Sequence, residues 1–276
     1  MSIGAVVVLY NPDNDVMDNI HTYLPIVDYL VAVDNSTHAS RIVKELASDK
    51  KSEIIEMGGN KGIATALNAG CSRLVELGCD IALTMDQDSR FPLEQSESIL
   101  SEVQHLIKEY AIVGLNYNNM PHGVDDISVP KYWLTSGNFL SLGAYEKVGG
   151  FNDELFIDYV DIEFNHRLRK AGMNICYLNN FSLQHKIGNP ISIHIFGRTY
   201  YAMNESPVRC YYRYRNSRYL YKTDKQFYWR KFWSEILLNI PKILLFEPEK
   251  KEKMRMVCRG LRDGGLGVLG PLKEAV

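Results

Sequence analysis

The first half of the chain alternates short apolar runs with helical patterns, and this alternation restricts the fold more than any other feature. Four runs have the length and composition of buried strands, and they cover residues 3–10, 29–36, 52–57 and 80–86. Helical patterns separate the later runs at residues 39–49 and 61–78, and the second pattern has an apolar stripe at three- and four-residue spacing. Strands that alternate with helices predict βαβ units and therefore a parallel sheet.

The alternation continues for one more unit and then ends. A helical pattern at 95–109 precedes a strand-like run at 111–116. Residues 116–133 are loop-like in composition, and a strand-like segment at 132–142 is interrupted by Gly137. The sheet is thus predicted to continue past its parallel part in a less regular form.

The second half of the chain is mostly helical in pattern. Residues 158–172 have helical periodicity and end at Gly172, a residue suited to a helix C-cap. From about residue 200 onward the chain is aromatic, basic and helical in pattern. We therefore predict an α/β domain over residues 1–200 and a helical extension over residues 201–276.

Polar residues follow each of the four predicted parallel strands. They are Tyr10 and Asn11, Asp34 and Asn35, residues 58–61, and residues 86–88. In an open parallel sheet, ligands bind outside the carboxyl ends of the strands. The sequence thus predicts that these residues line one edge of the sheet and form a ligand site there.

The fourth strand ends in the sequence "MDQD", which places two carboxylates two positions apart. Asp86 and Asp88 can both reach one hard divalent cation, and Mg²⁺ or Mn²⁺ accepts such oxygens while it keeps positions open for phosphates. A buried pair of carboxylates without a partner would be costly, which favours a cation. The alternative is structural, because the same residues could cap the helix predicted at 95–109.

A second acidic segment opens the helix predicted at 158–172. Asp158 and Asp161 are three positions apart, so on a helix they share one face, whereas Glu163 points elsewhere. A catalytic role is not required to explain Asp158 and Asp161, because the helix dipole favours acidic residues in a first turn.

Seven segments in order resemble the family 2 nucleotide-sugar glycosyltransferases of GT-A fold, and more narrowly the bacterial rhamnosyltransferases of that family. The segments are "VVVLYNP" (6–12), "AVDNS" (32–36), "GGNKGIATALNAG" (58–70), "MDQDS" (85–89), "TSGNFLS" (135–141), residues 149–172, and "YYRYRNSRYL" (211–220). The resemblance implies a Rossmann-like mixed sheet flanked by helices, with residues 1–200 as the catalytic domain. It also implies inverting transfer from a nucleoside-diphosphate sugar, with Asp86 and Asp88 holding Mg²⁺ or Mn²⁺ on the diphosphate.

The resemblance assigns donor-site roles to further residues. Tyr10 and Asp34 would line the nucleoside pocket, while Asn60 and Gly62 would meet the ribose or the sugar. His185 would complete the metal or diphosphate site, although a lone histidine after an apolar run is often structural. Arg215, with Asn216, would lie near the diphosphate, and a guanidinium suits a leaving phosphate.

The resemblance also assigns the acceptor side. An inverting transfer needs a base that deprotonates the acceptor hydroxyl, and Asp161 matches the aspartate of the family's acidic pair. Val160 replaces the usual glutamate of that pair, so Asp158, which lies earlier, would bind the acceptor or would itself be the base. Ser136 and Gly137, with Thr135, would form part of the acceptor pocket.

Charge is unevenly distributed along the chain. Residues 199–276 contain 16 Lys and Arg against 8 Asp and Glu, whereas residues 1–198 contain 15 against 25. The segment 224–246 mixes aromatic and basic residues before an apolar stretch, which is typical of a helix that lies on a membrane surface. The alternative is a helical pair that packs on the catalytic domain or on a second subunit of a homo-oligomer.

The resemblance implies an enzyme that moves rhamnose from dTDP-rhamnose to a glycan or polyprenyl-linked oligosaccharide in bacterial surface polysaccharide (O-antigen) synthesis. A UDP-sugar transferase of the same fold and a non-catalytic nucleotide-binding or glycan-binding module are the alternatives. Nucleic acid is not expected as a partner, because the first 198 residues are acidic. Five cysteines without a CxxC pair, no apolar stretch of about 18 residues and no signal-peptide pattern predict a cytoplasmic protein, peripheral on the inner face of the plasma membrane if the tail binds lipid.

Overall fold

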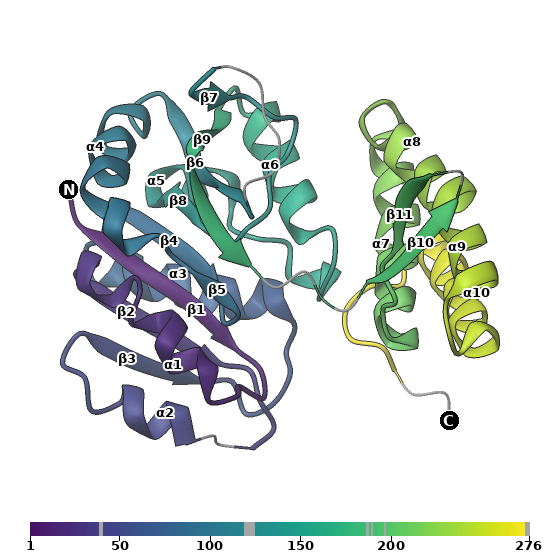
Figure 1. Ribbon diagram of the computed structural model, residues 1–276, viewed down its shortest axis with the longest axis horizontal. Coiled ribbons are helices and arrows are strands. Elements are labelled where there is room, and N and C mark those ends of the chain that lie inside the picture. The colour runs from purple at the N-terminus through teal and green to yellow at the C-terminus, as the bar shows by residue number, and fades with distance from the viewer. Residues whose placement is uncertain (39–40, 119–124, 186–187, 189, 196, 274–276) are drawn as a thin grey trace. The chain divides into compact units, whose positions relative to one another are not determined.

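The computed structural model describes residues 1–38, 41–118, 125–185, 188, 190–195 and 197–273, and it divides the chain into two compact units. The N-terminal unit comprises Met1–Asp153 and Val160–Lys186, and the C-terminal unit comprises Glu154–Tyr159 and Ile187–Val276. Figure 1 shows a sheet flanked by helices in the first unit and a helical bundle with a small hairpin in the second.

Nine strands of the described residues form one mixed sheet in the N-terminal unit. Four parallel neighbours come first: β3 (Ser52–Glu56), β2 (Tyr29–Asp34), β1 (Ile3–Leu9) and β4 (Ile81–Asp86). The order continues with β8 (Asn138–Ser141), β6 (Tyr110–Tyr117) and β9 (Asn174–His185), and the two-residue strands β5 (Ser89–Arg90) and β7 (Ile127–Ser128) pair with β9. Because β8 runs antiparallel to both β4 and β6, the sheet is mixed rather than purely parallel.

The predicted strands of the first half are confirmed, whereas the later part differs. The predicted strand at 132–142 begins only after Gly137, as β8, and the sequence pattern did not predict β9. Of the stretch predicted to be a loop, residues 119–124 lie outside the described residues.

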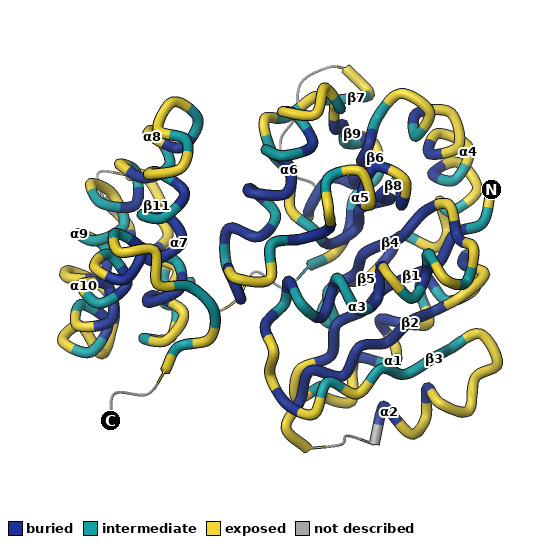
Figure 2. Tube along the Cα trace, turned by 180° about the vertical axis from the view of Figure 1, so that it is seen from behind, coloured by how far each residue is buried: buried dark blue, intermediate teal, exposed yellow. Residues whose placement is uncertain are grey.

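β1 is buried along its whole length because helices cover both faces of the sheet. One face packs against α1 (Asp15–Ile20), α2 (Arg41–Leu46) and α4 (Ser96–Leu106), and β1 contributes its odd-numbered residues to that core. α3 (Ile63–Glu76) packs on β1 and β2, and the unit also contains α5 (Leu142–Val148) and α6 (Val160–Lys170). Figure 2 shows the central strands as buried and the outer turns as exposed.

Each of the four predicted helices is shorter than expected. The helix predicted at 39–49 is α2, which covers residues 41–46, and residues 39–40 lie outside the described part of the chain. The helix predicted at 158–172 is α6, which begins at Val160, because Asp158 and Tyr159 adopt positive φ angles of 62° and 67°. Gly172 has φ 79° just after the helix, as expected for a residue that ends it.

The C-terminal unit is a helical bundle with one hairpin, β10 (Ile191–Ile195) and β11 (Arg198–Ala202). Its helices are α7 (Pro207–Thr223), α8 (Lys225–Ser234), the π-helical segment η4 (Glu235–Asn239), α9 (Ile240–Phe246) and α10 (Lys250–Leu266). A Cβ atom on Gly264 would lie 2.1 Å from the carbonyl oxygen of Arg215, so glycine in α10 permits the close approach of α7. No described helix has the length and apolar content that are needed to cross a bilayer.

Candidate functional site

The sheet topology gathers three separate segments at one edge of the N-terminal unit. β4 and β9 end at this edge, whereas β8, which runs antiparallel to β4, begins there. Asp86 closes β4, His185 closes β9, and residues 135–137 lead into β8. The strand order thus explains why residues far apart in the sequence meet here.

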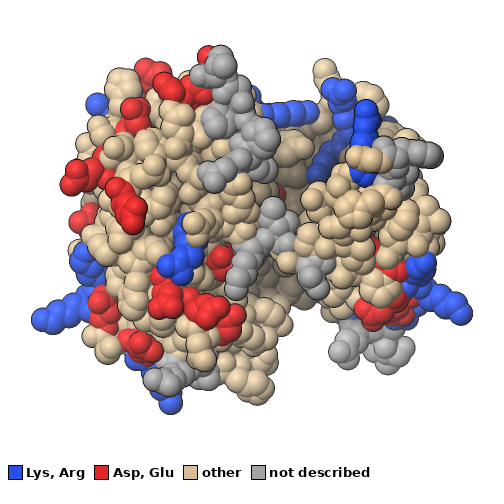
Figure 3. Space-filling model, viewed as in Figure 1, with Lys and Arg blue, Asp and Glu red and all other residues tan. Residues whose placement is uncertain are grey.

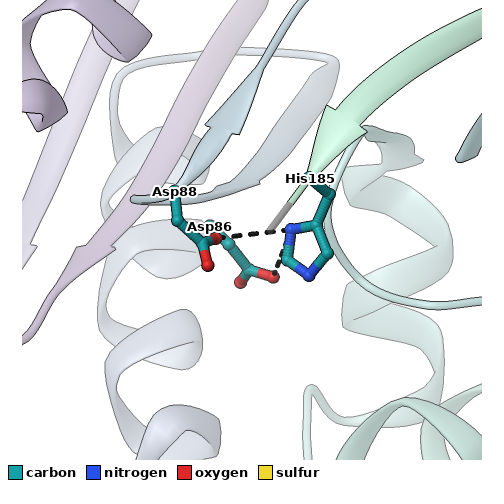
Figure 4. A group of neighbouring side chains, drawn as sticks. All are labelled: Asp86, Asp88 and His185. Atoms are coloured by element: carbon teal, nitrogen blue, oxygen red, sulfur yellow. Dashed lines mark ion pairs between the residues drawn. The ribbon is translucent and has the colours of Figure 1, made fainter. Parts of the chain in front are cut away.

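Asp86, Asp88 and His185 form a compact cluster of potential metal ligands. The Nδ1 atom of His185 lies 3.3 Å from Oδ1 of Asp88 and 4.0 Å from Oδ2 of Asp86. One ligand atom from each residue lies within 4.8 Å of the others. Figure 4 shows both carboxylates and the imidazole ring pointing toward one another. Since both carboxylates are partly exposed, a cation and a substrate can reach them from solvent.

The donor set fits a divalent cation. Two carboxylates supply the oxygen ligands that Mg²⁺ and Mn²⁺ prefer, and imidazole adds a nitrogen ligand that transition metals accept more readily than Mg²⁺ does. Three protein ligands leave further coordination positions for phosphate oxygens or water. The residues therefore suit Mn²⁺ well and remain compatible with Mg²⁺.

The electrostatics of His185 reflect its two acidic neighbours. Burial by itself would lower the pKa of His185, but the hydrogen bond with Asp88 and the charges of Asp86 and Asp88 outweigh burial. The pKa of His185 therefore lies above its ordinary value of 6.5. The ring faces a negative site, as expected where a cation is to bind.

Buried hydroxyl groups hold the cluster in place. Ser89 Oγ lies 2.8 Å from His185 Nδ1, and Ser136 Oγ donates to Ser89 Oγ over 2.8 Å. The backbone N–H of Asp86 donates to Ser136 Oγ over 2.9 Å, so a continuous chain joins β4, β8 and β9. Ser89 is fully buried and is the register partner of His185 across β5 and β9. The predicted acceptor residue Ser136 thus supports the cluster, and its contact with an acceptor stays a prediction.

Two residues near the cluster were not found from the sequence. Tyr117 is buried, its hydroxyl donates to the carbonyl of Ser136, and its ring meets the His185 ring edge-on with centroids 5.8 Å apart. Asn118 exchanges two hydrogen bonds with the backbone of His185, at 2.8 and 3.0 Å. Both residues lie in the stretch that the sequence identified only as a loop, so no sequence signal indicated them.

The Gln87 side chain and the Tyr10 backbone join two strand ends at this edge. Gln87, which lies between the two aspartates, accepts from the N–H of Tyr10 over 2.8 Å and donates to its carbonyl over 3.2 Å. Tyr10 is 47% exposed at the edge of the sheet, where a flat aromatic ligand can stack on its ring. The sequence placed Gln87 at this edge as part of residues 86–88 without giving it a role, and the structure shows that it joins the ends of β1 and β4.

Asp34 and the turn before α3 lie along the same edge. Asp34 is buried and accepts from the N–H of Ser36 over 3.0 Å. Asn35 accepts from the N–H of Lys61 over 2.7 Å, and Asn60 accepts from the N–H of Gly62 over 3.0 Å. Gly62 has φ 91°, which permits this tight turn. These hydrogen bonds hold residues 60–62 of the turn, and contacts of Asn60 and Gly62 with a nucleotide sugar stay predictions.

Asp161 lies in the first turn of α6 and faces the segment that leads into β8. It lines a small cavity together with Thr84, Thr135 and Asn138. The charges of both Asp86 and Asp161 add to burial in raising the pKa of Tyr117, which indicates that both carboxylates act on the same region. The structure thus brings the predicted base to the edge that carries the metal-ligand cluster.

Asp158 does not share a helical face with Asp161, contrary to expectation. It precedes α6, belongs to the C-terminal unit and pairs with Arg209, whose Nη2 atom lies 3.2 Å from Oδ1 of Asp158. The reason is backbone geometry, because the positive φ angle of Asp158 is incompatible with a helix. A role as base or acceptor ligand stays a prediction for this residue.

Arg215 and Asn216 are fully buried in the C-terminal unit. The guanidinium of Arg215 donates to the carbonyls of Glu154, Leu155 and Gly270. The Asn216 amide donates to the carbonyls of residues 155, 157 and 158 over 2.8 to 2.9 Å. This packing makes both residues a structural anchor for residues 154–158, and it does not favour the predicted contact of Arg215 with a diphosphate.

The chain is similar to two curated proteins, while no protein-family model matches it. It is 31% identical over 236 residues to the dTDP-rhamnosyl transferase RfbF of Shigella flexneri, and the match covers 78% of each protein. It is 23% identical over 201 residues to the low-salt glycan biosynthesis hexosyltransferase Agl10 of Haloferax volcanii, over 63% of each.

Solved structures resemble the fold at low identity. GalNAc-T7, solved with UDP, GalNAc and Mn²⁺, matches with a TM-score of 0.63 and 9% identity, over 96% of this chain and 56% of that chain. Residues 1–349 of S. aureus TarS match with a TM-score of 0.57 and 13% identity, over 97% of this chain and 72% of that chain. The chain thus spans little more than half the length of the GalNAc-T7 structure.

Proposed function

The chain belongs to the rhamnosyltransferase-like glycosyltransferases of family 2, and from this premise we propose that it transfers rhamnose from dTDP-rhamnose to a glycan. The mixed sheet with flanking helices is the GT-A fold, as predicted, and the protein is a nucleotide-sugar glycosyltransferase of polysaccharide synthesis. The choice of donor is supported by the name of the Shigella relative.

One observation carries the proposed mechanism: the cluster Asp86, Asp88 and His185 lies on the sheet edge that Asp161 also faces. In the proposed reaction, Asp161 removes a proton from the acceptor hydroxyl, whose oxygen attacks the anomeric carbon from the side opposite the diphosphate. The bond between the anomeric carbon and the diphosphate oxygen breaks, dTDP leaves, and the configuration inverts. Asp86, Asp88 and His185 would hold Mn²⁺ or Mg²⁺, and the bound ion supplies positive charge for the departing diphosphate.

The remaining residues of the edge would bind the donor. The exposed ring of Tyr10 would stack on the base, and the Asp34 carboxylate would accept a hydrogen bond from it. The turn at residues 58–62 would meet the ribose or the sugar, because its backbone can approach closely at Gly62. The acceptor would enter beside Thr135 and Gly137, and we propose a polyprenyl-linked oligosaccharide in the cytoplasm as the acceptor.

The experiment is a transfer assay with wild type, Asp88→Ala and Asp161→Asn. Both variants should lose most of their transfer, and Asp161→Asn should still bind the donor, because it alters only the base. Undiminished transfer by both variants would refute the mechanism. Titration with dTDP and UDP distinguishes the proposed donor from a UDP-sugar, and nucleotide binding without turnover on any donor would favour a non-catalytic module.

A further inference from the structure

The longest continuous helical segment of the C-terminal unit carries apolar side chains on its outer surface. α8, η4 and α9 follow one another without a break from Lys225 to Phe246. Seven large apolar residues of this segment are 39–65% exposed: Trp229, Trp233, Leu237, Leu238, Leu244, Leu245 and Phe246. Trp229, Trp233 and Leu237 recur at intervals of four residues, and Leu244 and Leu245 follow Leu237 and Leu238 at seven, which is about two helical turns, so the apolar residues run along the segment. We call them the apolar stripe.

The stripe is not an incomplete hydrophobic core, because the opposite side of the same helix is already packed. Tyr228, Phe232 and Ile243 are buried, and Ile243 joins a core cluster with Tyr214 of α7 and Val257 of α10. A helix on the surface of a soluble unit usually turns polar residues outward. A contiguous exposed apolar surface of this kind marks a site that another apolar phase covers.

Basic residues border the stripe, and exposed acidic residues are scarce beside it. The cations in or next to this segment in the sequence are Lys222, Lys225, Arg230, Lys242, Lys250 and Lys251. Arg230 lies over the Trp229 ring, and Lys250 donates to the carbonyl of Leu245. Within residues 222–251, all of which the structure describes, Asp224 is half-buried at the start of α8, and Glu235 and Glu247 are buried against Arg213 and Lys253. Glu249 is thus the only exposed carboxylate in this range. Figure 3 shows basic side chains gathered around the α8 end of this unit. The surface therefore favours an anionic partner.

A groove with aromatic and basic walls adjoins the stripe at Trp233. It is lined by Arg218, Tyr221, Lys225 and Phe232 among others. The guanidinium of Arg218 lies over the Tyr221 and Phe232 rings, at 5.8 and 5.6 Å from their centroids. An open groove with a cationic wall beside an apolar ridge suits a phosphate head group whose acyl chains lie along the ridge.

We propose that the apolar stripe and its basic border dock the protein on the surface of an anionic phospholipid bilayer. The tryptophans and leucines enter the boundary between head groups and acyl chains, while the lysines and arginines contact lipid phosphates. A second copy of the chain is a poorer occupant, because two basic borders would face each other across the interface. The inference goes beyond the proposed transfer reaction and does not depend on which sugar is moved.

Flotation of the whole protein with lipid vesicles tests the inference without any turnover. The vesicles are phosphatidylcholine with 30–40% phosphatidylglycerol (roughly the anionic share at which surface attraction is strong) or phosphatidylcholine alone, each at low and high salt. The variants are Leu237→Glu/Leu245→Glu in the stripe and Lys225→Gln/Arg230→Gln in the border. Leu266→Glu is the matched control, because Leu266 is exposed in the same unit but lies outside the stripe.

Wild type and Leu266→Glu should float with anionic vesicles, and the stripe variant should lose binding about tenfold or more. The border variant should bind anionic vesicles less tightly than wild type does, and its binding should depend less on the salt concentration. Two of the three tryptophans lie in the stripe, so wild-type fluorescence should shift to the blue on binding. Circular dichroism checks that each variant is folded.

Three outcomes would overturn the inference. Wild type that stays unbound in the presence of anionic vesicles at low salt is the first, and a folded stripe variant that binds as wild type does is the second. The third is a wild-type dimer in light scattering that the stripe variant dissociates without any vesicle binding, which would assign the stripe to a second copy of the chain.

Discussion

The imidazole Nδ1 of His185 lies 3.3 Å from the carboxylate of Asp88, although the two residues come from opposite halves of the N-terminal unit's sequence. The contact exists because β9 and β4 end at the same edge of the sheet, with β5 and β9 paired beside them. Two aspartates close in sequence could occur in any turn, but with His185 beside them they form a set of three potential metal ligands. The metal affinity of such a site depends on the residues that hold its three ligands in place.

Ser89→Ala should weaken metal binding while leaving the fold intact. Ser89 Oγ fixes the orientation of His185 and is itself held by Ser136. Loss of an outer hydrogen bond to a metal ligand typically costs 10- to 100-fold in affinity. Calorimetric titration with Mn²⁺ measures the change, and Ser101→Ala on the exposed side of α4 is the control. Equal Mn²⁺ affinity in Ser89→Ala and wild type would rule out this supporting role.

Arg213→Ala should destabilise the C-terminal unit strongly. Arg213 Nε lies 2.8 Å from Glu235, whose side chain is almost fully buried, and Nη1 lies 3.0 Å from Glu205. Removal of one partner of a buried pair leaves a charge without its counterion, which costs about 3–5 kcal/mol. Urea unfolding followed by circular dichroism measures this loss. Arg255→Ala, which breaks an exposed pair with Glu252, should leave the unfolding midpoint almost unchanged.

Glu235 of this cluster predicts a loss of stability in acid, whereas burial raises the pKa of its neighbour Glu205. Burial by itself would raise the pKa of Glu235, but the charge and hydrogen bond of Arg213 and the charge of Lys231 lower it below its ordinary 4.5. A carboxyl whose folded pKa is depressed stabilises the fold fully above its unfolded pKa, and this contribution disappears as pH falls through the folded value. The unfolding free energy should therefore fall below about pH 4.5, and Glu235→Gln should show a smaller pH dependence there. An equal slope in both proteins would contradict this assignment.

Thiol modification should label one cysteine rapidly. Cys258 is exposed, whereas the other four cysteines are buried. Burial raises the pKa of Cys71, Cys176 and Cys210 to about 12, so their reactive thiolate form is rare at neutral pH. A thiol reagent at pH 8 should count one fast site per folded chain and five after denaturation. Cys258→Ser should abolish the fast phase, and a remaining fast phase would show that a buried thiol is accessible.

The parallel half of the fold could be predicted from local sequence, because β1 to β4 are apolar runs whose periodicity is visible directly. Because the end of β4 was predicted correctly, Asp86 and Asp88 could also be placed at the carboxyl end of that strand. β9 could not be found in this way, since exposed polar residues such as Asn180 interrupt its apolar pattern. Residues that act through tertiary contacts, such as Ser89 and Tyr117, have no local signature.

Two differences have a physical origin that sequence patterns do not contain. Positive φ angles at Phe156, Asp158 and Tyr159 delay the start of α6, and such angles are uncommon for residues other than glycine. Arginine is a residue type that often binds phosphate, but the guanidinium of Arg215 donates to the backbone carbonyls of residues 154, 155 and 270. The roles of these residues depend on how distant segments pack.

The central claim is that Asp86, Asp88 and His185 hold a divalent cation that helps bind the donor diphosphate. The most direct measurement is the affinity for dTDP, with UDP in parallel, in the presence and absence of Mn²⁺. In wild type and in Glu97→Gln, which removes a carboxylate from exposed α4, Mn²⁺ should raise nucleotide affinity about tenfold or more, or about 1.4 kcal/mol. Asp88→Asn should lose that gain while it retains the metal-free affinity. The claim is contradicted if Mn²⁺ leaves the affinity of wild type for both nucleotides unchanged, or if Asp88→Asn gains as much as wild type.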